Sequence, residues 1–181
     1  MIRRRMPLMV ILAIIVVGVI VDQITKALAV AYLEPGQPVS IISDFFQLQL
    51  HRNPGAAFST GTSFTLVFAI LALVVLVAVS IFVIPKVESM IWAITVGLGT
   101  AGVLGNFIDR LSQPPAPFGG YVIDFFAVKY FAVFNVADIF LTTSAFLIVI
   151  ITLVVKVDFA GNKYKSSHAD GKSAELAQKQ E

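Results

Sequence analysis

Two pairs of asparagine and aspartate stand out in a mostly apolar chain. In each pair, Asn106 with Asp109 and Asn135 with Asp138, the residues are three positions apart. That spacing places both side chains on one face of a helix. Asp138 precedes a long apolar run, and ionisable groups at membrane depth are costly and often functional. The simpler alternative is that these residues only cap helices or join them by hydrogen bonds.

The residues that the chain lacks limit its chemistry. It has no cysteine, which excludes disulfides, thiolate catalysis and cysteine-ligated metal. It has no G-x-S-x-G sequence, and its two histidines, His51 and His168, are too far apart for an H-E-x-x-H zinc motif. We therefore expect no metal and no organic cofactor. His51 is expected to be a surface residue near a turn, and His168 falls in a polar tail.

Two facing carboxylates can hydrolyse a peptide bond without a cofactor. One takes a proton from water, and the other donates a proton to the scissile carbonyl or to the leaving nitrogen. Desolvation and mutual repulsion would keep one of the two protonated, so the pair would titrate as a coupled dyad. The candidates are Asp22, Asp109, Asp124 and Asp138.

Two of these aspartates have a basic neighbour in the sequence. Asp22 has Lys26 four positions later, a spacing suited to an ion pair on a helix. Asp109 is followed directly by Arg110, a positive charge that could hold Asp109 ionised and structural. We therefore expect these two carboxylates to support the site.

The other two aspartates have no basic residue within four positions, since Lys129 is five residues from Asp124. The charge pattern favours Asp124 and Asp138 as the catalytic pair. Asn106 and Asn135 could orient carboxylates or bind the substrate backbone.

Membrane-spanning helices are the elements that must position these residues. The chain has 181 residues, of which 57% are hydrophobic and 13% charged, whereas soluble proteins have about 25% charged residues. A span needs about 20 apolar residues. Four stretches qualify or nearly qualify, at about 6–30, 64–84, 89–108 and 139–155.

We predict an all-α integral membrane protein with four transmembrane helices. One domain, residues 1–156, would contain the spans and two outer loops, at 31–63 and 111–137. Residues 157–181 would form a polar, disordered cytoplasmic tail. A cleaved signal peptide at the start is less favoured, because the uncharged run is long and Asp22 and Lys26 follow it.

The basic residues predict the orientation. Nine of the thirteen Lys and Arg lie at the termini or between the second and third spans. Because cytoplasmic segments carry an excess of Lys and Arg, we expect both termini and the turn at 85–88 to face the cytoplasm. This distribution needs no nucleic-acid partner.

Counting residues along the spans brings the charges to one membrane face. Lys26 lies 21 positions after Arg5, and Asp109 lies 21 positions after Glu88, which is about 30 Å of helix in each case. The fourth span runs the other way and puts Asp138 at the same outer face. Both long loops belong to that side.

The outer loops have the composition of strands. The segment 47–58 begins with a strand-like alternation of polar and apolar residues and turns at an Asn-Pro-Gly sequence. The segment 119–134 is rich in aromatic and β-branched residues. We predict a small extracytoplasmic β-rich cradle. It must rest at the interface or against the helices, because open strands cannot lie in lipid.

Five short sequences occur in a set order along the chain. They are DQITK at 22–26, NPGAAF at 53–58, GVLGNFIDR at 102–110, VIDF at 122–125 and FNVAD at 134–138. Together they resemble the motifs of bacterial lipoprotein signal peptidase, or signal peptidase II, an aspartyl membrane protease family. The resemblance covers roughly residues 7–155.

The resemblance implies that Asp124 and Asp138 are the catalytic aspartates. It also implies a polar shell that supports them and binds substrate: Asp22, Lys26, Asn53, Asn106, Asp109, Arg110 and Asn135. Members of the family remove signal peptides from prolipoproteins by cutting just before a cysteine that carries diacylglycerol. The expected partners are therefore diacylglyceryl-prolipoproteins and membrane lipid, with a monomer working at the extracytoplasmic face of the bacterial cytoplasmic (inner) membrane.

Two other classes of function remain to be weighed. A small ion-coupled or proton-coupled transporter subunit would place carboxylates near the bilayer midplane and interrupt its helices, whereas the counts above place the charges at one face. A purely structural scaffold would leave the clustered motifs unexplained.

Overall fold

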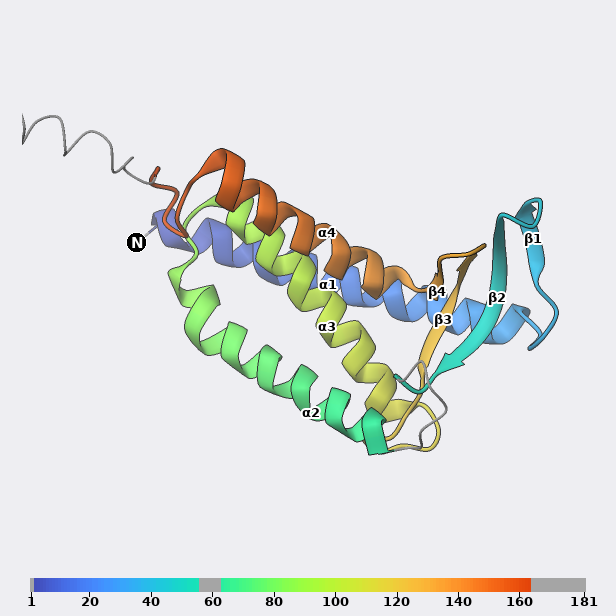
Figure 1. The fold of residues 1–181 in the computed structure, drawn as a ribbon. Helices are drawn as coiled ribbons and strands as arrows, with labels where there is room; N and C mark the ends of the chain where they lie inside the picture. The colour runs from blue at the N-terminus through green and yellow to red at the C-terminus, as the bar shows by residue number, and fades with distance from the viewer. Residues whose placement is uncertain (1, 56–62, 164–181) are drawn as a thin grey trace, which may run out of the picture.

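The computed structural model describes residues 2–55 and 63–163. Long helices form a bundle, and a small sheet lies at one end of it (Figure 1). The helices are α1 (Ile2–Tyr32), α2 (Ser63–Ala78), α3 (Met90–Ser112) and α4 (Val136–Ile150). The strands are β1 (Val39–Ile42), β2 (Phe46–Asn53), β3 (Val122–Val128) and β4 (Ala132–Phe134). The main structural predictions, four spans and a small sheet, are confirmed.

Short turns of other helical types extend two of the helices. A π-helical turn at Val79–Val83 and a 3-10 turn at Ile84–Lys86 continue α2, and a π-helical turn at Ile151–Val155 continues α4. With these turns, four helical segments of the described chain are long and apolar enough to cross a membrane. They are Arg5–Tyr32, Thr65–Lys86, Met90–Ser112 and Val136–Val155.

Two helix ends differ from the predicted limits of the spans. The third helix continues past residue 108 to Ser112, because Asp109 is buried and paired within the bundle. The fourth helix begins at Val136 rather than near residue 139, because Asn135 caps it. Asp138 therefore belongs to the first turn of α4.

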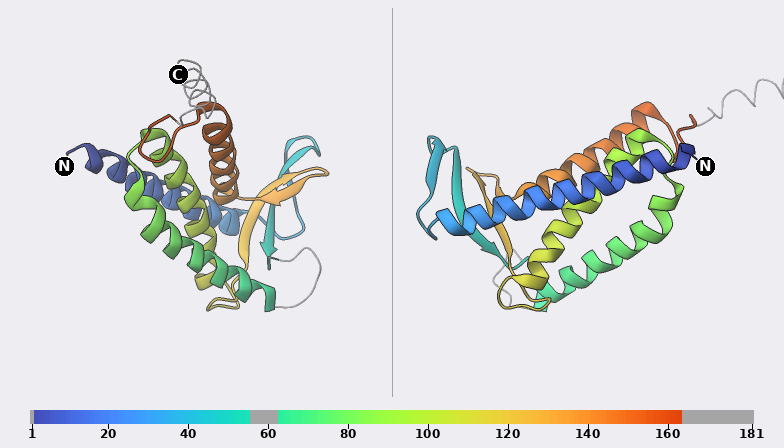
Figure 2. Two further views of the ribbon diagram at one scale, coloured as in Figure 1. Left: turned by 60° about the vertical axis from the view of Figure 1, so that its left-hand side comes forward. Right: turned by 180° about the vertical axis from the view of Figure 1, so that it is seen from behind.

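The central helix of the bundle is α3. Of the 18 most apolar consecutive residues of α3, 44% are buried, and their mean hydropathy is 1.6. In the corresponding stretch of α2 only 6% are buried, and the mean hydropathy is 3.3. A helix that packs against its neighbours needs less lipid-compatible surface than one that faces lipid. Figures 1 and 2 show α1 and α4 lying along α3, whereas α2 comes near α3 mainly at its two ends.

Two glycines of α3 allow close approach of its neighbours. A Cβ at Gly102 would lie 2.5 Å from the carbonyl oxygen of Ala137, and a Cβ at Gly105 would lie 2.5 Å from Oδ2 of Asp22. Any larger residue would push α4 or α1 away. The GVLGN sequence thus brings the beginning of α4 and the polar end of α1 against α3.

The sheet is antiparallel with the strand order β1-β2-β3-β4. Its inner surface packs on the end of α1 through Ala29, Phe125 and Val136, and Phe46 stacks on Phe126 at 5.9 Å between ring centroids. The described N-terminal end and the end of α4 lie at the end of the bundle opposite the sheet (Figures 1 and 2).

The segment after α4 closes the other end of the bundle. The carbonyl of Phe159 accepts from the backbone N–H groups of Glu88 and Ser89, at 2.8 and 3.0 Å, and Trp92 Nε1 donates to the Val157 carbonyl at 3.1 Å. The prediction of a disordered tail is therefore wrong for residues 157–163, because the α2–α3 turn supplies these donors. His168 lies outside the described residues.

Candidate active site

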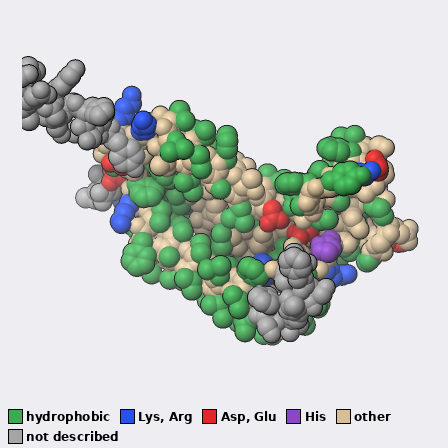
Figure 3. Space-filling view, in the orientation of Figure 1, with side chains coloured by type: hydrophobic (Ala, Val, Ile, Leu, Met, Phe, Trp, Pro, Cys, Tyr) green, Lys and Arg blue, Asp and Glu red, His purple; other side chains and the backbone are tan. Residues whose placement is uncertain are grey.

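A group of polar residues lies where the bundle meets the sheet, and Figure 3 shows a small acidic area at this junction. The residues come from α1, α3, α4, β2 and β3. Hydrogen bonds connect all four aspartates that the sequence analysis selected, Asp22, Asp109, Asp124 and Asp138.

Lys26 is the cation at the centre of the buried part of this network. Its Nζ lies 2.9 Å from Oδ2 of Asp22, 2.9 Å from Oδ2 of Asp109 and 3.0 Å from Oδ1 of Asn106. The three N–H donors of the ammonium group are thereby matched by three acceptors. Lys26 is 2% exposed and the two carboxylates are 0% exposed, so this cluster is a buried structural support for the site.

The basic partner of Asp109 differs from the expectation. The adjacent Arg110 was expected to hold this carboxylate ionised, but residues at i and i+1 of a helix do not face each other. Asp109 pairs instead with Lys26 of α1 and accepts from the backbone N–H of Ile123 at 3.0 Å. This carboxylate therefore joins α1, α3 and β3.

Arg110 lies further from the buried cluster. Its Nη1 donates to the Asn106 carbonyl at 3.0 Å, and its guanidinium lies 5.9 Å from the centroid of the Phe68 ring. Its buried Nε has no hydrogen-bond partner among the residues that the structure describes. Arg110 is thus a second cation at the edge of the carboxylate group.

Sequence reasoning missed Gln23. Its Nε2 lies 3.1 Å from Asp22 Oδ2, 3.1 Å from Asp109 Oδ1 and 3.2 Å from the Gly105 carbonyl. The residue stands inside the DQITK sequence, directly after Asp22. A polar amide at the outer end of a span was the available signal.

Asn106 connects the buried cluster to Asp138. Its Oδ1 accepts from Lys26, and its Nδ2 donates to Asp138 Oδ1 at 2.8 Å. The same Oδ1 accepts from Asn135 Nδ2 at 3.1 Å. Asn106 therefore fixes the orientation of Asp138 from α3.

Asn135 is the N-cap of α4 and forms a capping box with Asp138. Its Oδ1 accepts from the Asp138 backbone N–H at 3.0 Å, and its own backbone N–H donates to Asp138 Oδ2 at 3.1 Å. Its remaining amide group donates to Asp124 Oδ1 at 2.6 Å. A single residue thus positions both proposed catalytic carboxylates.

Asp124 lies on the buried strand β3 and is 1% exposed. Besides Asn135, its partner is Asn53, whose Nδ2 donates to Oδ2 at 2.8 Å. Burial raises the pKa of Asp124 to about 6, and repulsion by Asp138 also raises it. The hydrogen bonds from the two asparagines and the charge of Lys26 oppose these effects.

A bulge in β2 brings Asn53 to Asp124. Leu48 pairs with Phe126 and His51 pairs with Asp124, so β2 has one residue more than β3 between these pairs. Because side chains alternate between the faces of a strand, this additional residue puts Asn53 on the face of Asp124. His51 is exposed, as predicted, and lies opposite Asp124 in this register.

The arrangement suits proton transfer between two carboxyl groups. The four aspartates and the two cations would carry a net charge of −2 if all were ionised (two positive minus four negative). Retaining one proton on the Asp124 and Asp138 pair reduces the repulsion. The pair could therefore act as one acid and one base at the same time.

Two apolar cavities flank α4 below the polar group. The larger, about 350 Å³, lies between α2, α3 and α4 and extends from Val103 and Leu141 to Trp92 and Phe159. The smaller, about 270 Å³, lies between β4 and α4 and includes Asp138 in its wall.

The structure brings together eight of the nine site residues predicted from sequence through hydrogen bonds or ion pairs between their side chains. The ninth, Arg110, is joined to the group through its bond to the Asn106 backbone. Part of the NPGAAF sequence, at 56–58, lies outside the described residues.

Residues 14–154 match the family model described as Signal peptidase (SPase) II. Several relatives named lipoprotein signal peptidase are similar along most of the chain. The relative from Rhodococcus jostii is 41% identical over 145 residues, which are 79% of this chain and 73% of that protein. The one from Mycobacterium tuberculosis strain H37Rv is 40% identical over 161 residues, 88% of this chain and 77% of that protein.

A solved structure shares the fold. The protein, described as a bacterial membrane enzyme whose structure was obtained by the in meso method, is 32% identical to this chain with a TM-score of 0.65. The match covers 80% of this chain and 92% of the other.

Proposed function

This chain belongs to the signal peptidase II family, a family of proteases of bacterial membranes, and we propose that it is an aspartyl endopeptidase that removes signal peptides from lipoprotein precursors. Its substrates are diacylglyceryl-modified prolipoproteins, and it cuts just before the lipidated cysteine. The names of its relatives and the five sequence motifs support this substrate class. The catalytic residues are Asp124 and Asp138.

The connection of these two carboxyl groups through Asn135 is the observation that carries the proposal. Asn135 donates to Asp124 and forms a capping box with Asp138. Aspartic hydrolysis needs two carboxyl groups that share one proton, and the bonds to Asn135 join these two groups in one hydrogen-bonded network.

In the proposed mechanism, the ionised carboxylate takes a proton from water while the water oxygen attacks the carbonyl carbon of the scissile peptide bond. The protonated carboxyl donates its proton to the carbonyl oxygen as the tetrahedral intermediate forms. The proton taken from water then moves to the leaving nitrogen and the C–N bond breaks, while one hydroxyl of the intermediate returns its proton to the carboxylate that had donated it. Asn106, Asn53 and Asn135 hold the carboxyl groups, and Lys26 with Asp22 and Asp109 supports them from below.

The protein would work as a monomer in the cytoplasmic membrane, with both termini in the cytoplasm and the sheet on the outer side. The distribution of Lys and Arg supports this orientation, as does the position of the sheet opposite the described N-terminal end and the end of α4. The scissile bond of a lipid-anchored substrate would lie near the membrane surface, and the length of the spans supports a position of the polar group at the same depth.

The test is a cleavage assay with the purified full-length protein and matched peptides with and without a diacylglyceryl cysteine. We expect cleavage of the lipidated peptide only. Asp124→Asn and Asp138→Asn should each abolish cleavage. Asp44→Asn, which changes an exposed carboxylate paired with Lys129, should leave it unchanged. Robust processing by either catalytic variant would refute the assignment of the dyad.

A further inference from the structure

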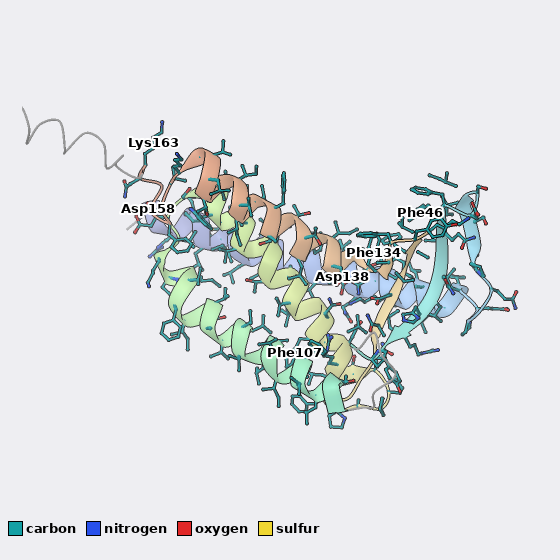
Figure 4. All side chains as sticks on the ribbon, in the orientation of Figure 1. Phe46, Phe107, Phe134, Asp138, Asp158 and Lys163 are labelled. Carbon is teal, nitrogen blue, oxygen red and sulfur yellow. The ribbon has the colours of Figure 1, made fainter. Side chains whose placement is uncertain are left out.

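A pocket between the sheet and the fourth helix opens beside Asp138. This β4–α4 pocket has a volume of about 270 Å³ and is lined by Phe131, Ala132, Phe134, Ile139, Thr142 and Thr143, with Asp138 in its wall. Figure 4 shows Phe134 and Asp138 next to each other where the last strand meets α4. A group bound in this pocket would contact a proposed catalytic carboxyl.

The pocket is apolar except for two hydroxyl groups. Thr142 and Thr143 are exposed, and neither hydroxyl has a hydrogen-bond partner among the described residues 2–55 and 63–163. By contrast, the hydroxyls of Thr95 and Thr100 in α3 donate to carbonyls four residues earlier, at 2.8 and 2.7 Å. Two free donors on the lipid-facing side of a span are available to a ligand.

The depth of these donors relative to Asp138 limits the kinds of ligand that could bind them. Thr142 is four residues after Asp138, one helical turn or about 6 Å deeper in the membrane. A matching ligand has hydrogen-bond acceptors a few bonds from the scissile peptide and continues into apolar chains. A diacylglyceryl group has this chemistry, since its ester carbonyls accept hydrogen bonds and its acyl chains are apolar.

The larger cavity between α2, α3 and α4 does not offer the same chemistry. It has no carboxyl group in its lining, and its two buried hydroxyls are already used: Thr100 donates to Val96, and Ser144 donates to the Thr95 carbonyl at 2.8 Å. It can therefore accommodate apolar chain but provides no donor for an ester.

We propose that the β4–α4 pocket binds the glyceryl ester end of the diacylglyceryl group on the substrate cysteine, with Thr142 and Thr143 donating to the ester carbonyls. Phe131, Phe134 and Ile139 contact the first methylenes of the acyl chains. The inference rests on the proposed function and assigns the lipid of the substrate to one side of α4.

The first experiment compares a diacylglyceryl peptide with the matching dialkyl ether peptide, which lacks the ester carbonyls. The wild-type protein should cleave the ester with a KM at least fivefold lower, since a hydrogen bond contributes about 1 kcal/mol. The isosteric double variant Thr142→Val, Thr143→Val should lose this preference and keep its kcat. Thr152→Val, an exposed threonine outside both cavities, should retain it.

Each result of this experiment bears on a different statement. If the wild-type protein cleaves neither lipidated peptide, the proposed function fails. If it cleaves both with the same KM, or if the double variant keeps the ester preference, the proposed function stands and the lipid site is wrong.

A second experiment locates the lipid directly. A substrate peptide whose glyceryl group carries a photoreactive diazirine is crosslinked to the full-length Asp124→Asn variant, and the attachment sites are mapped by mass spectrometry. We expect labelling at pocket residues within 131–139 and at Thr142 or Thr143. Labelling confined to the cavity residues between 75 and 103 would overturn the proposal. Ala132→Trp, which fills the pocket, should reduce labelling at least tenfold relative to Ala160→Trp outside it.

Discussion

The side-chain amide of Asn135 donates to Asp124 at 2.6 Å while the same residue caps the helix that carries Asp138. The cap restricts the side-chain torsions of Asn135, so the direction of its donor group is set by the start of α4. The geometry of the proposed dyad and the beginning of this helix are therefore one structural feature.

Substitution of Asn135 should separate capping from catalysis. Serine can still accept the N–H of Asp138 as a helix cap but has no amide to donate to Asp124. We expect Asn135→Ser to keep its thermal midpoint close to that of the wild type and to lose about 100-fold in kcat. Asn135→Ala should lose activity and about 1 kcal/mol of stability as well. A serine variant with wild-type kcat would contradict this role.

The rate should depend on pH through Asp124. Burial raises the pKa of this carboxyl to about 6, so it holds the proton of the dyad at lower pH. We expect kcat/KM to fall as the pH rises through about 6. Asn53→Ala removes a hydrogen bond that lowers this pKa and should move the falling limb to higher pH. A limb that stays in place or moves to lower pH would exclude Asp124 as its origin.

The same carboxyl should make stability depend on pH. Because its pKa is raised from 3.8 to about 6, the folded state binds the proton more tightly than the unfolded state. The stabilisation is complete below the unfolded pKa and is lost as the pH rises through about 6, by about 3 kcal/mol. Thermal midpoints of wild type and Asp124→Asn between about pH 4 and pH 8 test this.

The expected difference between these two proteins has a definite sign. The wild type should lose stability relative to Asp124→Asn across this range. Asp44→Asn is the control, because the exposed ion pair with Lys129 lowers the pKa of Asp44, so its contribution is lost as the pH falls. Parallel curves for wild type and Asp124→Asn would show that Asp124 does not titrate in this range.

Removal of the buried cation should be strongly destabilising. Lys26→Met leaves Asp22 and Asp109 buried together without their counter-charge, for which a loss of about 3–5 kcal/mol is typical. The exposed Lys129→Met should cost much less, because solvent screens its ion pair with Asp44. The measurement is the free energy of unfolding in detergent. Adding Asp22→Asn and Asp109→Asn to Lys26→Met should restore part of the loss, and no recovery would argue against uncompensated charge as the cause.

A methyl group at Gly105 should disturb the buried cluster of Lys26, Asp22 and Asp109 that supports the site. Its Cβ would lie 2.5 Å from Asp22 Oδ2, whereas a Cβ at Gly119 would lie 3.6 Å from its nearest neighbour. We expect Gly105→Ala to lower the thermal midpoint and the kcat, and Gly119→Ala to change neither. Equal behaviour of the two variants would mean that α1 and α3 separate at no cost.

The sequence by itself determined the spans, and it predicted most of the residues that gather in the polar group, Gln23 excepted. Apolar runs of membrane length predicted four spans, because the thickness of a bilayer sets the length of a helix that crosses it. Spacing within one helix also predicted local contacts, such as the ion pair of Asp22 with Lys26, because residues four apart lie on one helix face.

Only the tertiary structure decided which residues from different elements meet. Lys26 rather than Arg110 pairs with Asp109, because the packing of α1 on α3 brings its ammonium group to that carboxylate. The bulge that places Asn53 beside Asp124 and the docking of Phe159 on the α2–α3 turn are likewise contacts between distant segments. The spacing of residues along the chain predicts contacts within a single helix or strand. Contacts between different elements depend on how the elements pack, and local spacing does not predict this.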